Sequence, residues 1–117
     1  MTGAPRGSRN DRGAGAVLAI ALVMAVVVIG LAGVTLAAAL SARQRVVGAT
    51  DLAALAAADA ASGAIAGVPC EVAAGVVRAG GARLAGCQAR GPVVTVTAVG
   101  SFAGIPIEAR AIAGPPS

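Results

Sequence analysis

The dominant pattern in the sequence is a long stretch without charge. Between Arg12 and Arg43 there is no charged side chain. The centre of this stretch, Val17–Leu31, is apolar on every side of a helix, and such a helix must be surrounded by lipid or by protein. A helix over residues 14–40 would be roughly 40 Å long, enough to cross the hydrocarbon core of a bilayer. We therefore predict a single transmembrane helix over residues 14–40. The anchor side chains expected to contact lipid are Val17, Leu18, Ile20, Leu22, Val26, Val27, Val28, Ile29 and Leu31.

The uncharged stretch has two other interpretations. A core helix of a globular domain is disfavoured, because such helices seldom run past about 25 residues without a polar face. A cleaved secretory signal has small-residue sites available, with release after Ala39 or Ala42. The apolar region is about twice the roughly 7 to 15 residues of a signal core, which favours a retained anchor.

The residues on either side of the stretch indicate its orientation. Residues 1–13 carry Arg6, Arg9 and Arg12 against Asp11, and have too little apolar surface to fold, so we expect a disordered basic tail. Three arginines precede the anchor and two follow it, which predicts a cytoplasmic tail and a C-terminal region outside the cytoplasmic (inner) membrane.

Residues 41–66 predict a helical stalk that continues the anchor. Gly48 is the only helix breaker before the Gly63–Gly67 run, and alanine is the strongest helix former. The apolar residues do not form a distinct stripe, while the alanines permit close approach of another element. A helix that is solvated or packed on its own domain and a helix that contacts other subunits both fit this composition. The Gly63–Gly67 run should end the helix, since Pro69 follows it.

Residues 67–117 predict a small extracytoplasmic region of mixed α and β structure. Pro69 can open a second helix that carries Glu71 in its first turn and ends at Gly80. The β-branched run Val93–Val99 and the alternating run Ile105–Ile112 read as a β-hairpin, with Pro106 marking an edge strand. A bare hairpin is barely stable in water, so the second helix should cover it. The predicted fold class is therefore α+β and membrane-anchored.

Composition supports a membrane protein with a marginal outer domain. The chain of 117 residues is 57% hydrophobic and 12% charged, with one Phe and no Tyr or Trp. The outer region thus lacks the large rings that supply most of a compact core's buried area, and we expect it to depend on partners. The net charge of +4 comes from scattered arginines without interleaved aromatics, so nucleic-acid binding is not expected.

Cys70 and Cys87 are the only cysteines, and both follow the anchor. An even count in an oxidising compartment favours a disulfide over two free buried thiols. The bridge would tie the second helix to the first predicted strand. It would close a loop of about 18 residues and contribute roughly 3 kcal/mol.

Nothing in the sequence predicts catalysis. There is no His, and two cysteines cannot complete a four-ligand zinc site. The glycines form no phosphate-binding loop. We expect no metal, no cofactor and no small-molecule substrate, since the carboxylates are spread along the chain: Asp11, Asp51, Asp59, Glu71 and Glu108.

The order of these segments resembles one protein family. A short basic tail with Arg12-Gly13 before the apolar helix is followed by Gln44–Ala58, which includes Asp51-Leu-Ala-Ala-Leu-Ala-Ala-Ala58, and by a β region ending at Pro116. This arrangement resembles the TadE-like pseudopilins of the tight-adherence (Flp) pilus and related type II/IV secretion clusters, particularly the short helicase/secretion-neighbourhood TadE-like proteins. The resemblance spans residues 9–116.

The resemblance implies a pilin-like structural component of pilus or secretion assembly. Its implied partners are the lipid bilayer, other pilins, a platform protein and a secretion ATPase complex. In pilin-like proteins a prepilin peptidase cuts after a glycine before the helix, here by analogy Gly13, which would leave Ala14 as the new terminus. The glutamate usual at the fifth mature position would fall on Leu18, which cannot supply a carboxylate.

Two other function classes stay open on the sequence. One is a small secreted protein released by signal peptidase after Ala39 or Ala42. The other is a single-pass regulatory subunit that binds another membrane protein through the small residues Gly30, Gly33 and Ala37.

Overall fold

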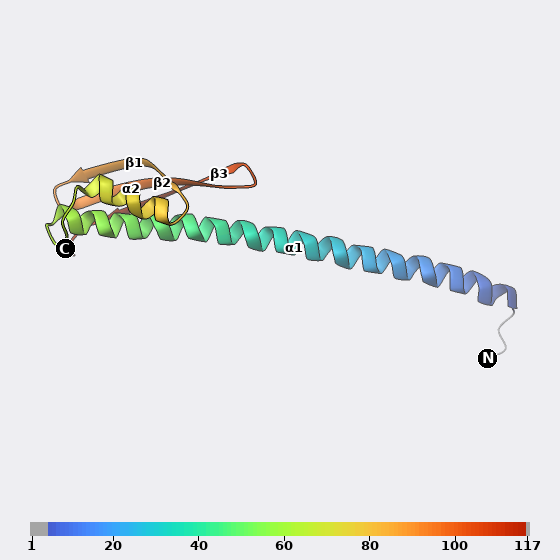
Figure 1. Ribbon diagram of the computed structural model, residues 1–117. Coiled ribbons are helices and arrows are strands. Elements are labelled where there is room, and N and C mark those ends of the chain that lie inside the picture. Colours follow the sequence, from blue (N-terminus) through green and yellow to red (C-terminus); the bar gives the residue numbers. More distant parts are fainter. Residues whose placement is uncertain (1–4, 117) are drawn as a thin grey trace. The chain divides into compact units, whose positions relative to one another are not determined.

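The structure, a computed structural model, describes residues 5–116, with side chains from Arg12 onward. The chain divides into two compact units between Ala37 and Ala38. Its elements are a long helix, a short helix and a three-stranded antiparallel sheet, which confirms the predicted α+β class (Figure 1). In chain order they are α1 (Pro5–Ala61), α2 (Pro69–Ala79), β1 (Arg83–Arg90), β2 (Val93–Phe102) and β3 (Ile105–Ala113).

The predicted transmembrane segment 14–40 lies entirely within α1. The helix begins at Pro5, where the missing N–H of proline costs no helical hydrogen bond. Residues 5–13 are therefore helical, and the prediction of a disordered tail is wrong for them. Residues 1–4 lie outside the described part of the chain.

In the second unit α1 is a core helix and not a free stalk. Buried residues recur along it at helical spacing. Of the predicted alternatives, the structure therefore shows a helix packed on its own domain. The buried residues of this helix face are Val46, Ala49, Thr50, Ala53, Ala54, Ala57 and Ala60. The Thr50 hydroxyl donates a hydrogen bond of 2.6 Å to the carbonyl oxygen of Val46, which satisfies the one buried polar side chain among them.

The helix ends at Ala61, five residues before the predicted boundary at 66. The N–H of Ser62 still donates to the carbonyl oxygen of Ala58, and turns and bends follow through Gly67. Gly63 and Gly67 have φ of 82° and 133°, values that favour glycine. The glycine run therefore ends the helix, as predicted.

The predicted hairpin is confirmed as β2 and β3. Their pairing runs from Val94 opposite Ala113 to Phe102 opposite Ile105. The connection is the two-residue turn Ala103-Gly104, with φ of 50° and 79°, as in a type I′ turn. β3 lies at the edge of the sheet, where Pro106 is tolerated. β2 extends to Phe102, three residues into the predicted loop 100–104, whereas β3 begins at Ile105 as predicted.

β1 was not predicted from the sequence. It pairs with β2, but the register shifts between Leu84 and Gly86, so Ala85 bulges out. The bulge lets Leu84 and Cys87, three positions apart, both pack against the core. This spacing breaks the two-residue alternation by which a strand is recognised.

The core of the second unit is built from small side chains on α1, α2 and the sheet. Its fully buried members on α2 and β2 include Ala73, Val77, Val94 and Val96. α2 packs mainly against β1 and less against β2, so it covers only a small part of the hairpin that it was predicted to cover (Figure 1). The alanines of α1 complete the core.

The disulfide Cys70–Cys87 is present, which confirms the predicted pairing. It joins the first turn of α2 to β1, with the two Cα atoms 5.7 Å apart. The strand that it ties down is β1, and not the first strand of the predicted hairpin. The disulfide thus holds α2 against β1, the strand whose alternation of buried and exposed residues is least regular.

Replacing both cysteines by serine should destabilise the second unit by about 3 kcal/mol, because the unfolded chain regains the entropy of the closed loop. In the full chain in detergent micelles, this change should reduce hydrogen-exchange protection of the β2 amides by about 100-fold. An exposed control, Ser101→Ala, should leave protection unchanged. Equal protection in the two variants would show that the bridge adds no stability.

Gly80 and Gly75 offer a matched test of the close packing between α1 and α2. A Cβ at Gly80 would lie 2.5 Å from the Cβ of Ala49, whereas a Cβ at Gly75 meets nothing within 4 Å. Gly80→Ala should therefore cost about 1–3 kcal/mol through overpacking. Gly75→Ala, inside the helix, should stabilise it by up to about 1 kcal/mol. The measurement is again β2 hydrogen exchange in the full chain.

A third variant separates the clash from other effects of Gly80→Ala. Adding Ala49→Gly removes the opposing Cβ and should recover part of the lost stability. If Gly80→Ala proved as stable as Gly75→Ala, the inferred contact between α1 and α2 would be wrong.

Candidate functional site

The candidate site in the first unit is the apolar surface of α1. All nine predicted anchor side chains are exposed, from 47% at Val27 to 70% at Ile29. Within the described residues, α1 is the one helix long and apolar enough to cross a membrane, judged by length and composition. Leaving this many large apolar side chains in water is unfavourable, so the surface requires a lipid or protein environment.

The polar groups of this segment are already satisfied. Thr35 is the only polar side chain between Ala14 and Leu40. Its hydroxyl donates a hydrogen bond of 2.9 Å to the carbonyl oxygen of Leu31, one turn earlier. A helix with all its backbone and side-chain polar groups paired internally meets the main requirement of the bilayer interior.

The residues predicted for processing and for helix contact all lie on α1. Gly13 is exposed in the helix, and its cleavage stays a prediction, as does the role of Leu18 at the fifth mature position. Gly30, Gly33 and Ala37 are exposed, and a Cβ built at either glycine meets nothing within 4 Å. This small-residue surface is therefore accessible to another helix.

The two signal-peptidase sites fall where the second unit begins. Ala39 and Ala42 are partly buried, and the first buried residue after them is Val46. Cleavage after Ala42 would therefore leave the buried side of α1 in place. The secreted alternative would remove the first residues of the second unit but keep its buried core.

A leucine face on α1 exposes two large apolar side chains in the second unit. Leu52 and Leu55 are 62% and 57% exposed, although the alanines beside them are buried. We define the leucine face as Arg45, Gly48, Leu52, Leu55 and Asp59, which recur every three or four residues. From the sequence, residues 41–66 show no distinct apolar stripe, and no role was predicted for these two leucines.

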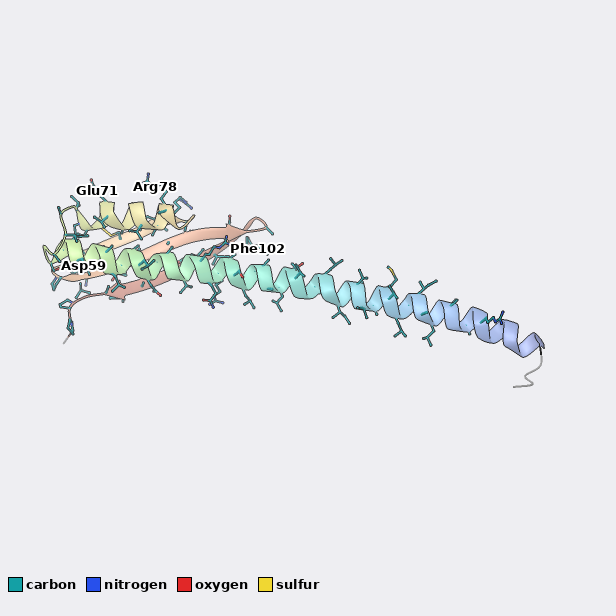
Figure 2. All side chains as sticks on the ribbon, turned by 60° about the horizontal axis from the view of Figure 1, so that its bottom comes forward. Asp59, Glu71, Arg78 and Phe102 are labelled. Atoms are coloured by element: carbon teal, nitrogen blue, oxygen red, sulfur yellow. A yellow bond between two sulfur atoms is a disulfide. The ribbon has the colours of Figure 1, made fainter. Side chains whose placement is uncertain are left out.

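The carboxylates do not form a catalytic or metal-binding cluster within the described residues. Asp51 and Asp59 lie on α1, Glu71 on α2 and Glu108 on β3, and all four are exposed. Figure 2 labels Asp59 and Glu71 on separate helices, and Arg78 in the last turn of α2. The charges of Glu71 and Arg78 complement the α2 helix dipole. No group of three His, Cys, Asp or Glu side chains suited to a metal occurs from Arg12 to Pro116.

The outer face of the sheet is polar and shallow. Across its centre, Thr97 lies between Gly86 and Arg110, and the neighbouring hollow of about 350 Å³ is open to solvent. The hollow holds no carboxylate and no nucleophile other than hydroxyl groups, because its other lining residues are Cys87, Gln88 and Thr95. The arrangement offers hydrogen bonding but no acid–base pair.

Comparison of the chain with protein-family models, with curated proteins and with solved structures finds no significant match.

Proposed function

We propose that this chain is a single-pass membrane protein that acts as a structural assembly component, a TadE-like minor pseudopilin, of a Flp-type pilus or a type II/IV-like secretion system. The observation that carries the proposal is the exposed, uncharged surface of α1, in a chain whose second unit is small and disulfide-bonded. The segment order that resembles TadE-like proteins supplies the assembly role. No enzymatic activity is part of the proposal.

The disulfide supports the proposed topology. Disulfides persist in oxidising compartments and are rare in the cytosol. Cys70 and Cys87 both follow the anchor, and their bond favours a second unit outside the cytoplasmic membrane. The arginine bias around the anchor independently favours a cytoplasmic N-terminus.

The leucine face is the surface that we assign to contacts with other subunits. Exposed leucines between a basic end at Arg45 and an acidic end at Asp59 suit a partner helix with complementary charges. The proposed partners are other pilins and the platform protein, with the secretion ATPase acting through that platform.

A second candidate function is a small secreted protein released after Ala39 or Ala42. It is favoured by one observation, that the buried side of α1 begins only at Val46. A third class, a regulatory subunit bound through Gly30, Gly33 and Ala37, has only the small-residue spacing in its support.

Fractionation of a bacterial host that expresses the full chain tests the first proposal against the second. The chain should stay with membranes after a high-salt wash, because lipid solvates the anchor. Protease added to spheroplasts should digest the second unit after reduction. Recovery in the medium without the first 40 or so residues would instead establish the secreted form.

Intact-mass measurement of the membrane-bound form tests processing at Gly13. We expect a chain that starts at Ala14. A chain that starts at Met1, or at any other residue, would show that no prepilin peptidase acts at this position. A Gly13→Leu variant is the control, and it should keep the uncut mass.

A photo-crosslinking amino acid at Leu52 tests the leucine face. It should capture a pilin or platform subunit in cells that carry the assembly system, and the Leu55→Arg substitution should reduce that product about tenfold, as the loss of a buried apolar contact predicts. The same crosslinker at Val68, which is also exposed but lies before α2, should not capture either subunit. Equal products from both positions would remove the assigned role of the face.

A further inference from the structure

The β2–β3 hairpin extends beyond the rest of the sheet. β1 pairs with β2 from Val93 to Val99, so Gly100, Ser101 and Phe102 pair only with β3. The hairpin tip, defined as residues 100–107, is therefore a two-stranded ribbon. It carries no charge, since the first charged residue after Arg90 is Glu108.

The tip packs beside the start of the second unit's helix segment and forms an apolar groove with it. The groove has a volume of about 230 Å³ and is lined by Ala39, Leu40 and Arg43 of α1 and by Phe102, Ile105 and Ile107 of the hairpin. Figure 2 labels Phe102, the only aromatic residue of the chain, at this end of the hairpin. Leu40 and Ile105 remain exposed, so the groove is not covered by the protein itself.

The α1 wall of the groove is the end of the uncharged segment. Ala39 and Leu40 belong to that segment, and Arg43 is the first charge after it. From Arg12 to Arg43 a helix rises about 45 Å, which matches the roughly 40–45 Å of a bilayer with its headgroup regions. With both arginines at the outer edges of the headgroups, Leu40 lies about 5 Å deeper than Arg43, in the boundary between headgroups and acyl chains.

We propose that the hairpin tip inserts into the headgroup region of the bilayer that α1 spans, with lipid filling the groove. The inference rests on the proposed membrane function. Ile105, Leu40 and Phe102 contact acyl chains near the headgroups, and the guanidinium of Arg43 faces lipid phosphate, a geometry in which a long basic side chain keeps its charge in the polar zone. Ala39 and Leu40 belong both to the groove and to the uncharged segment, which is why lipid is assigned as the occupant.

Tryptophan fluorescence tests this insertion, because the chain has no Trp or Tyr of its own. The full chain is reconstituted in phosphatidylcholine vesicles, with and without lipid brominated near the headgroup. Ile105→Trp should emit at short wavelength, and bromination should lower its emission about twofold, as for an indole at the interface. Phe102→Trp, which keeps Ile105, should behave in the same way.

Ile112→Trp is the matched control. Ile112 lies on the same strand and is 67% exposed, against 65% for Ile105, but it faces the other side of the sheet at the far end of β3. Its indole should emit as in water and should not be quenched. If Ile105→Trp and Phe102→Trp both behaved like Ile112→Trp, the hairpin tip would not be in lipid.

Leu22→Trp, in the middle of the anchor, separates this proposal from the proposed function. Quenching of Leu22→Trp by lipid brominated deep in the acyl chain, without quenching at Ile105, would overturn the hairpin proposal alone. Loss of quenching at both positions would overturn the membrane function as well. A blue-shifted but unquenched Ile105→Trp would indicate that protein, and not lipid, covers the groove, which also contradicts the proposal.

Discussion

Close packing of small side chains is the interaction on which the second unit depends. The core has no buried aromatic ring, and its largest fully buried side chains are Val77, Val94, Val96 and Thr50. Each small side chain buries little apolar surface. The core therefore gains enough dispersion contacts only if its helices and strands approach one another closely. At Gly80 an added Cβ would meet Ala49, and at Gly100 it would meet Val46, so both glycines mark close approaches to α1. The disulfide then supplies the stability that so small a core does not.

The sequence predicts well those elements whose local signals agree with their packing. α2 has proline at its start and glycine at its end, and the β2–β3 hairpin has β-branched residues around a glycine-containing turn. The pairing of Cys70 with Cys87 followed from the count of two. β1 could not be predicted, because the bulge at Ala85 and the low strand propensity of its alanines and glycine hide the alternation.

The buried side of α1 in the second unit was hidden for a different reason. Hydrophobic periodicity is read from large apolar residues, yet here Leu52 and Leu55 face outward while Ala53, Ala54 and Ala57 are buried. Alanine faces inward because only a small side chain allows the sheet and α2 to lie this close. The long apolar helix of the first unit, by contrast, was predictable from its uncharged and uniformly apolar sequence, while the hairpin groove required the register of β2 with β3.

The groove and the core are rigidly related, because residues 39–43 and 46–60 are successive turns of one helix within the second unit. Under the proposed function, the depth in the bilayer at which the uncharged segment ends therefore also sets the depth of the hairpin tip. Gly100 strengthens this relation, since its missing side chain lets β2 contact Val46 only one turn beyond Arg43. An apolar tip held there by backbone contact has few alternatives to lipid, and no flexible linker is needed to bring it to the membrane surface.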